Sequence, residues 1–360
     1  QMMETSEVVA GVRLPWVEKY RPQTLNDVYS HEEITKTLKK WIDTNQLPHM
    51  LFYGPPGTGK TTSILAVART LFSDKQRNSM VLELNASDDR GIGVVRDEIV
   101  TFAQTKGLHS FGGNAANNDS KTNVKLVILD ECDAMTKDAQ NALRRVIEKY
   151  TENVRFCIIC NYLSNIIPAI QSRCTRFRFA PLNPELVAPR IDYVVQQEKL
   201  NITDDGKEAL LELSGGDMRR VLNVLQAASM AFPTVDAGAV YSCVGQPTPK
   251  EMDRLLRVLL NESFMDACEK IEKEYIEKGY ALADIITRLH DLVYQMIIPS
   301  DVTAGLVIAL ATTEQRLSVG CSDRLQTAGL VSAFIMARQR IGEYAKMRKE
   351  KDAEDKMETE

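Results

Sequence analysis

The feature that most constrains this chain is a glycine-rich segment, Gly54–Thr61, with the sequence GPPGTGKT. It matches the pattern G-x-x-x-x-G-K-[ST] without a mismatch, between an apolar run at Met50–Tyr53 and a helical pattern at Ser63–Leu71. Glycines let consecutive backbone N–H groups turn toward phosphate oxygens, and the start of a helix adds its dipole. The segment therefore predicts a P-loop phosphate site directly after a strand. The alternative is a glycine-rich turn with a chance lysine.

Two side chains of this P-loop have predicted roles of their own. We expect the ammonium group of Lys60 to bridge the β- and γ-phosphates of the nucleotide. We expect the hydroxyl of Thr61 to bind Mg²⁺. ATP and Mg²⁺ are therefore the predicted cofactors.

A second apolar run, Leu126–Leu129, ends in two carboxylates, Asp130 and Glu131. Neighbouring side chains of a strand point in opposite directions, so the two need separate roles. We expect Asp130 to join the Mg²⁺ shell and Glu131 to activate a water aligned with the γ-phosphate. A further run, Phe156–Cys160, leads to Asn161, whose amide could hold that water or contact the γ-phosphate. Without the P-loop, these residues would be interpreted as a turn, a helix cap and a loop residue.

The two halves of the chain differ in their apolar pattern. Short apolar runs with helical patterns between them are typical of buried parallel strands with helical crossovers. The predicted strands are Met50–Tyr53, Met80–Leu84, Val124–Leu129, Val154–Cys160 and Thr175–Phe179. The later segments with three-to-four spacing are Pro184–Glu198, Asp204–Leu213, Met218–Ala231, Lys250–Leu260, Ala281–Ile297, Ala304–Leu317 and Gln326–Tyr344. We therefore expect an α/β domain followed by helical domains.

The predicted domain boundaries follow from breaks in these patterns. We place an α/β domain at residues 1–182, a small helical domain at 183–246, a longer helical domain at 247–345 and a charged tail at 346–360. The tail is either a solvated helical extension or disordered, and we favour disorder for its last ten residues. The polar segment Ser110–Thr122 is expected to be a surface insertion.

The net charge of −5 first argues against a nucleic-acid partner. Residues 1–182, however, carry 23 basic and 20 acidic side chains, a net +3, whereas the remainder carries 21 and 29, a net −8. The half with the P-loop is therefore the half suited to phosphates. The longest nearly apolar run, Ala328–Ala337, is too short to span a membrane, so we expect neither export nor membrane association. Seven cysteines, an odd number, favour free thiols.

Further motifs carry a resemblance to a known family. The order of the P-loop, the acidic pair and the polar strand end, followed by Ser172–Cys174 and Gly216–Arg219, is similar to that of AAA+ ATPases of the clamp-loader group. Three segments narrow the resemblance to the small subunits of eukaryotic replication factor C: Trp16–Pro22, Glu83–Gly91 and Asn141–Glu148. Two more point to the subunit called 3 in budding yeast and 5 in humans: Glu148–Phe156 and Thr175–Phe179.

The resemblance implies an architecture and an activity. It implies an AAA+ RecA-like ATPase domain at residues 1–182, a lid at 183–246 and an oligomerising collar at 247–345. It implies a five-membered ring with the four other replication factor C subunits, one large and three small. That ring would open the sliding clamp, proliferating cell nuclear antigen, and load it onto primer–template DNA in the nucleus during replication and repair. The ATPase would be DNA-dependent and weak in the isolated chain.

The resemblance also assigns site residues. The adenine pocket would be lined by Val17, Arg21, Val28 and Tyr29. The phosphates would be held by Gly54, Pro55, Pro56, Gly57, Thr58, Gly59, Lys60, Thr61 and Thr62. Asn161 would be the first sensor of the γ-phosphate, and Arg219, from the lid, the second. Arg173 would be an arginine finger that acts in trans on the ATP of the next subunit.

The resemblance places DNA contacts at the start of one helix. Arg90, Ile92 and Arg96 would follow the phosphate backbone, which positions the duplex without reading its sequence. The alternative is a solvated helix face. Arg173 could likewise belong to a surface basic cluster with Arg176, and Arg219 could pair with an acidic neighbour in the lid.

Two other functions remain open at this stage. The chain could be a non-hydrolysing structural subunit in which ATP serves only ring assembly. An RNA helicase would also carry an acidic box like Asp130–Asp133, but it needs a second RecA-like domain, and the sequence beyond residue 182 lacks strands to build one.

Overall fold

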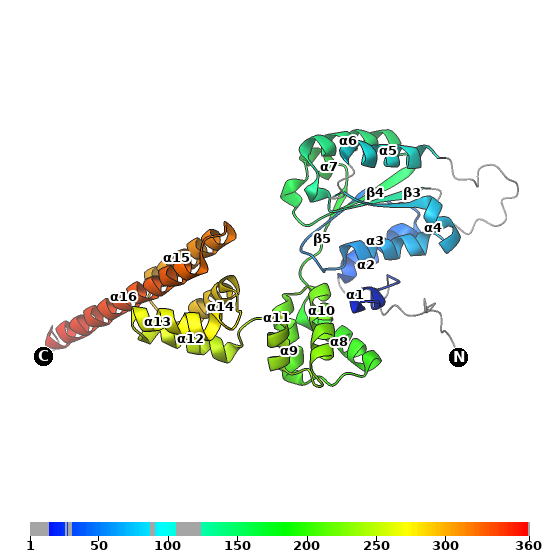
Figure 1. Ribbon diagram of the computed structural model, residues 1–360. Helices are drawn as coiled ribbons and strands as arrows, with labels where there is room; N and C mark the ends of the chain where they lie inside the picture. The colour runs from blue at the N-terminus through cyan, green and yellow to red at the C-terminus, as the bar shows by residue number, and fades with distance from the viewer. Residues whose placement is uncertain (1–13, 26, 28–30, 87–90, 106–123, 359–360) are drawn as a thin grey trace, which may run out of the picture. The chain divides into compact units, whose positions relative to one another are not determined.

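The structure, a computed structural model, describes residues 14–25, 27, 31–86, 91–105 and 124–358 (Figure 1). Residue contacts divide the chain into two compact units, residues 1–234 and 235–360. Each unit has a hydrophobic core of its own. The P-loop lies in the first unit.

The first unit is built on a five-stranded parallel sheet with the strand order β2-β3-β4-β1-β5. The strands are β1 (Met50–Tyr53), β2 (Val81–Asn85), β3 (Lys125–Asp130), β4 (Val154–Cys160) and β5 (Thr175–Arg178). The predicted α/β domain with parallel strands is therefore confirmed. Because all strands run the same way, their carboxyl ends share one edge. That edge holds the P-loop after β1, Asp130 at the end of β3 and Asn161 after β4.

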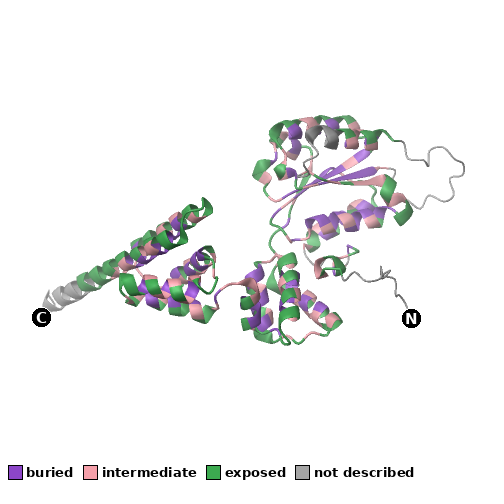
Figure 2. Cartoon of the chain, in the orientation of Figure 1, coloured by how far each residue is buried: buried purple, intermediate pink, exposed green. Residues whose placement is uncertain are grey.

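Helices cover both faces of the sheet (Figure 1). On one face lie α2 (Glu32–Asp43) and α3 (Lys60–Leu71), and on the other α5 (Gly91–Gln104) and α6 (Lys137–Tyr150). Strand side chains alternate between them, since Met50 and Phe52 pack with α2 and α3 whereas Leu51 packs with α5 and α6. Figure 2 shows the central strands buried between these layers. The shorter elements are α1 (Trp16–Lys19), α4 (Asp74–Met80), α7 (Pro168–Gln171) and the 3₁₀ turns η2 (Cys132–Ala134) and η3 (Leu163–Asn165).

Three helices complete the first unit, and we call them the lid: α8 (Pro184–Glu198), α9 (Asp204–Ser214) and α10 (Met218–Ala231). Side-chain caps set where two of them begin. The Thr203 hydroxyl accepts a hydrogen bond from the backbone N–H of Gly206 at the start of α9. The Asp217 carboxylate accepts the backbone N–H groups of Arg219 and Arg220 at the start of α10.

Within residues 235–358, the second unit consists of helices joined by short links, with one bridge residue at Val235. Its helices are α11 (Ala237–Val244), α12 (Pro249–Asn261), α13 (Phe264–Ile271), the π-helix η4 (Glu272–Ile276), α14 (Leu282–Gln295), α15 (Ser300–Ser318) and α16 (Asp323–Glu358). Leu289 of α14 and Phe334 of α16 are fully buried in its core. A capping box between Thr248 and Glu251 starts α12. In the ranges that the structure describes, no helix is both long and apolar enough to cross a membrane.

Some elements differ from the sequence expectations. The eight-residue helices α11 and α13 are not predicted by the apolar spacing. Helix α16 continues through Glu358, although we favoured disorder for the last ten residues. Extending an existing helix needs no new nucleus, and Lys, Glu and Ala are good helix formers. The insertion Ser110–Thr122 lies outside the described residues, and the domain boundaries at 182 and 246 stay predictions.

The buried imidazole of His49, just before β1, predicts acid sensitivity. Its Nδ1 accepts the backbone N–H of Phe156 at 3.2 Å. Burial, and to a smaller extent the charge of Arg155, lowers the pKa of His49 from 6.5 to about 4. The folded chain therefore disfavours protonation, so its stability is complete above pH 6.5 and falls as the pH approaches 4, by up to about 3 kcal/mol.

We expect His49→Gln, which keeps an acceptor for that N–H, to remove much of this loss. Both tryptophans of the chain, Trp16 and Trp41, belong to the first unit, so their fluorescence reports its unfolding in urea. The comparison is between pH 7 and pH 4.5 for both proteins. An equal loss of unfolding free energy in the variant would contradict the assignment to His49.

Candidate active site

The P-loop adopts a backbone that its glycines permit. Gly57 has a φ of +67°, and Gly54 has a φ of +141° and lies against the backbone of Phe179, directly after β5. A Cβ at position 54 would lie 2.0 Å from the carbonyl oxygen of Phe179. These two positions therefore require glycine, for the turn and for close approach. Helix α3 begins at Lys60, so its N-terminus faces the loop.

The ammonium group of Lys60 lies inside the loop. It donates to the carbonyl oxygens of Gly54 and Pro55 at 2.7 and 2.8 Å, and to Oδ1 of Asn161 at 3.0 Å. Burial lowers its pKa, the carboxylate of Asp130 raises it, and the guanidinium of Arg219 lowers it. Two cations close enough to disfavour each other make this a place where an anion is stabilised.

Thr61 and Asp130 meet across the start of α3 and the end of β3. The hydroxyl of Thr61 donates to Oδ2 of Asp130 at 2.7 Å. A hydroxyl and a carboxylate are hard oxygen donors, and Mg²⁺ is usually held by one or two such protein groups together with substrate phosphates. This donor pair therefore fits Mg²⁺.

Glu131 follows the last residue of β3 and adopts a left-handed backbone. It is exposed and has a φ of +54°, which is uncommon for a residue with a Cβ. Its backbone N–H donates to Oδ1 of Asp130 at 2.9 Å. Asp130 and Glu131 both line the same pocket, and their separate roles stay a prediction.

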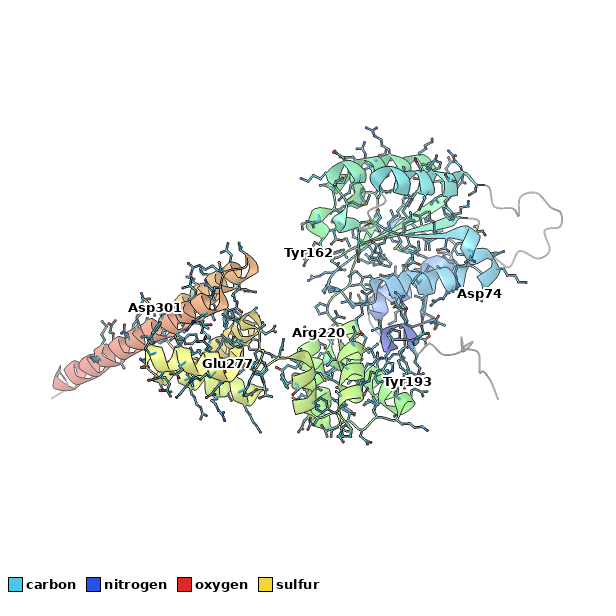
Figure 3. All side chains as sticks on the ribbon, viewed as in Figure 1. Asp74, Tyr162, Tyr193, Arg220, Glu277 and Asp301 are labelled. Carbon is cyan, nitrogen blue, oxygen red and sulfur yellow. The ribbon has the colours of Figure 1, made fainter. Side chains whose placement is uncertain are left out.

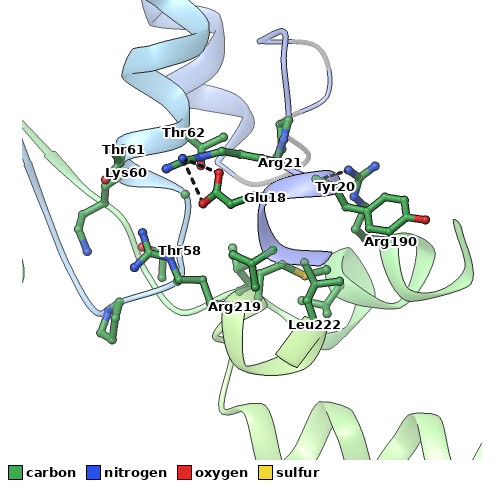
Figure 4. Close-up of a pocket in the computed structure, with 18 of the residues that line it drawn as sticks. Glu18, Tyr20, Arg21, Thr58, Lys60, Thr61, Thr62, Arg190, Arg219 and Leu222 are labelled. Atoms are coloured by element: carbon green, nitrogen blue, oxygen red, sulfur yellow. Dashed lines mark hydrogen bonds and ion pairs between the residues drawn. The ribbon is translucent and has the colours of Figure 1, made fainter. Parts of the chain in front are cut away.

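That pocket is bounded by the P-loop, α1 and the lid (Figure 4). Its lining residues are Val17, Glu18, Tyr20, Arg21, Pro22, Asp27, Pro56–Thr62, Asp130, Glu131, Asn161, Leu182, Leu186, Val187, Arg190, Met218, Arg219 and Leu222. Figure 4 shows Arg219 reaching from α10 toward the P-loop near Thr58. The pocket thus joins a phosphate-binding loop to a partly apolar wall, which suits a nucleotide.

Helix α1 is attached to the lid. Lys19 Nζ and Tyr20 Oη each donate to Oε1 of Glu198 at 2.6 Å. From α8, Arg190 Nη2 donates to the carbonyl oxygen of Tyr20 at 2.6 Å. Beside them, Glu18 pairs with Arg21 at 3.1 Å, shown as a dashed line in Figure 4. The pocket wall formed by α1 is therefore held by lid side chains.

The lid also contacts the P-loop directly. The backbone N–H of Met218 donates to the carbonyl oxygen of Gly57 at 3.2 Å. Outside the P-loop, the backbone N–H of Leu182 donates to the carbonyl oxygen of Gly216 at 3.1 Å. A Cβ on Gly57 would lie 1.6 Å from Oδ1 of Asp217, the cap of α10. The first residues of α10 are thus seated on the loop.

Arg173, which follows α7, does not line this pocket. Its Nη2 lies 2.6 Å from Oε1 of Glu148 on α6, and its Nη1 donates to the carbonyl oxygen of Ala169 at 2.6 Å. The guanidinium is exposed and paired at the surface of its own chain, away from the residues that meet in the pocket.

Most of the predicted site residues meet in the pocket. Val17, Arg21, Pro56 to Thr62, Asp130, Glu131, Asn161 and Arg219 line it, and Gly54 and Pro55 present carbonyl oxygens to Lys60. Val28, Tyr29 and Arg90 lie outside the described residues. Ile92 and Arg96 lie on α5, in the part whose side chains are not described. The sequence analysis missed Glu18, Tyr20 and the lining residues of α8; the amphipathic spacing of α8 could have indicated Val187.

Comparison with known proteins decides the family. The profile described as "ATPase family associated with various cellular activities (AAA)" matches residues 50–182, and "Replication factor C C-terminal domain" matches residues 247–333. A probable replication factor C subunit 5 of Caenorhabditis elegans is 57% identical over 91% of this chain and 88% of its own length. The human replication factor C subunit 5 is 54% identical over 91% and 93%, and Schizosaccharomyces pombe subunit 3 is 50% identical over 89% and 90%.

The chain belongs to the replication factor C family. The predicted resemblance, the AAA+ fold with a helical C-terminal domain, and the function as an ATPase subunit of a multi-subunit clamp loader are thereby confirmed. Membership favours this function over a non-hydrolysing subunit. The helicase alternative is excluded as well, because the described residues beyond 182 form no second sheet.

In this replication factor C chain, Gly57→Ala should weaken nucleotide binding at least about tenfold. The left-handed backbone alone costs about 1–2 kcal/mol with a Cβ, and the new methyl group would displace Asp217 and the start of α10. The measurement is titration with a fluorescent ATP analogue. The matched control is Gly215→Ala, where φ is +58° and a Cβ meets nothing within 4 Å. Equal affinities for both variants would contradict the contact between lid and P-loop.

Proposed function

We propose that this chain binds MgATP in the pocket between P-loop, α1 and lid, and hydrolyses it as part of the clamp loader. The observation that carries the proposal is that one pocket collects a phosphate-binding loop, a Thr61–Asp130 pair, Glu131, Asn161 and the lid residue Arg219. If ATP served only ring assembly, its site would need the P-loop and the lid but no carboxylate beside them.

The residues divide the work of phosphoryl transfer. We infer that Lys60 and Arg219 hold the β- and γ-phosphates, because both are cationic and Lys60 is buried at the start of α3. Thr61 and Asp130 would hold Mg²⁺, which bridges phosphate oxygens and neutralises their charge. Asn161, in contact with Lys60, would report the γ-phosphate as the first sensor.

Glu131 is the proposed activator of the attacking water. Its exposed side chain lines the pocket together with Asp130, whereas the hydrogen bond from the Thr61 hydroxyl goes to Asp130. Its left-handed backbone is a conformation that costs about 1–3 kcal/mol, and residues that adopt it cluster at functional sites. Accepting a proton from water as the phosphoryl bond breaks requires a carboxylate that is not itself a metal ligand.

Arg173 is proposed to act on the ATP of the next subunit. That Arg173 does not line the pocket of its own chain supports this role, since a finger in trans supplies positive charge only when the neighbour is docked. Glu148 holds the guanidinium at the surface before that contact. Hydrolysis would then depend on assembly, and the chain alone would turn over ATP weakly.

The proposed partners are the four other replication factor C subunits, the sliding clamp and primer–template DNA, in the nucleus. Family membership supports a multi-subunit complex. The net +3 of residues 1–182 supports a phosphate-facing half. Arg90, Ile92 and Arg96 are proposed to follow the DNA backbone, without base specificity; Ile92 and Arg96 belong to α5.

Glu131→Gln should abolish cleavage at this site while sparing nucleotide binding. An amide cannot accept the proton, and losses of this kind are about 10²- to 10⁴-fold. We expect the reconstituted complex to release one phosphate fewer per ring in its first turnover, with unchanged affinity for a fluorescent ATP analogue. Glu152→Gln, at an exposed carboxylate after α6, is the matched control. An unchanged phosphate count would favour the structural-subunit alternative.

A further inference from the structure

Asp133 has no role in the mechanism above, yet it contacts the backbone of a residue that has one. It lies on η2, two residues after Glu131. One oxygen of its carboxylate, Oδ2, accepts the backbone N–H of Asn161 at 3.1 Å and that of Tyr162 at 3.2 Å. Asp133 does not line the nucleotide pocket, so its contribution must pass through these neighbours.

The two bonded N–H groups stand where the chain leaves the sheet. Strand β4 ends at Cys160, and η3 begins at Leu163, so Asn161 and Tyr162 form the link between them. Tyr162 is 67% exposed, and Figure 3 labels it at the edge of the first unit. Packing of its side chain therefore contributes little to fixing the link. The link is instead held by two hydrogen bonds, because one oxygen of Asp133 accepts both backbone N–H groups.

The link decides where the side chain of Asn161 points. Its Oδ1 accepts a hydrogen bond from Lys60 Nζ at 3.0 Å, inside the P-loop. The contacts therefore run from the turn after β3, through the backbone after β4, to the phosphate-binding ammonium. A shift of about 1 Å in such a group is enough to impair a reaction that depends on positioning.

We propose that Asp133 is a positioning residue for Asn161: by holding two backbone N–H groups, it sets the carboxamide against Lys60 and the γ-phosphate. The proposal rests on the proposed function of Asn161 at this site. Asp133 would thereby couple the end of β3, which carries the acidic pair, to the end of β4, which carries the amide of Asn161.

Two properties of Asp133 must be separated, its acceptor oxygen and its charge. Asp133→Asn keeps an oxygen that can accept both N–H groups but removes the charge, whereas Asp133→Ala removes both. Asp138→Ala, an exposed carboxylate in the first turn of α6, is the matched control and should behave as the unmodified protein.

The test uses the reconstituted complex and follows the fast phase of phosphate release that we expect Asn161→Ala to slow. We expect Asp133→Ala to slow that phase at least about tenfold, with affinity for a fluorescent ATP analogue changed less than about twofold. Asp133→Asn should retain most of the rate. Adding Asp133→Ala to Asn161→Ala should cause no further loss, because the two act as one unit.

A second readout does not depend on activity. Hydrogen exchange of the peptide containing Asn161 and Tyr162 should become faster in Asp133→Ala and stay near the original rate in Asp133→Asn. Exchange in the α2 and α3 peptides should not change, which shows that the variant folds.

The outcomes separate the two proposals. If Asn161→Ala slows phosphate release but Asp133→Ala does not, the positioning role is overturned while the proposed function stands. Equal losses in Asp133→Ala and Asp133→Asn would assign the effect to charge and also overturn it, as would additive losses in the double variant. If Asn161→Ala changes nothing, the role of Asn161 fails and the role of Asp133 fails with it.

Discussion

The contact between Gly57 and the start of α10 is the constraint on which the rest of the site depends. The carbonyl oxygen of Gly57 accepts the N–H of Met218, and its missing Cβ leaves room for the carboxylate of Asp217. One glycine thereby serves the phosphate loop and the lid at once. Arg219 follows directly, so the side chain proposed to bind the phosphates is placed by the same turn that seats the lid.

A second set of contacts extends this coupling to the opposite wall of the pocket. Glu198 and Arg190 of α8 hold α1 by its Lys19 and Tyr20. The wall formed by Val17 and Arg21 is thus carried by the lid, although it comes first in the chain. A nucleotide bound here would touch the lid at its phosphates and also at the wall beside α1. We therefore expect the position of the lid to change whenever a nucleotide binds or leaves. In a ring of subunits, this coupling is one way to make hydrolysis depend on assembly.

The sequence predicted what local pattern determines and missed what the tertiary fold brings together. The P-loop, the acidic pair after β3 and the parallel strands have fixed spacings or apolar runs, so Lys60, Thr61 and Asp130 could be placed without coordinates. The attachment of Glu198 to Tyr20 joins residues 178 positions apart, and no local signal marks it. Asp133 looked like part of an acidic box, and only the fold shows that it accepts the backbone after β4. The extension of α16 was misjudged because mixed charge suits both a solvated helix and a disordered tail.

The central claim, that lid, α1 and P-loop respond to nucleotide as one site, can be measured by hydrogen exchange with and without a non-hydrolysable MgATP analogue. The account predicts slower exchange in three separate peptides: Val17–Arg21, Gly57–Thr62 and Met218–Leu222. These peptides should share one midpoint in analogue concentration, since the contacts between them form a single unit. Slower exchange confined to Gly57–Thr62, with the other two unchanged at saturation, would contradict it.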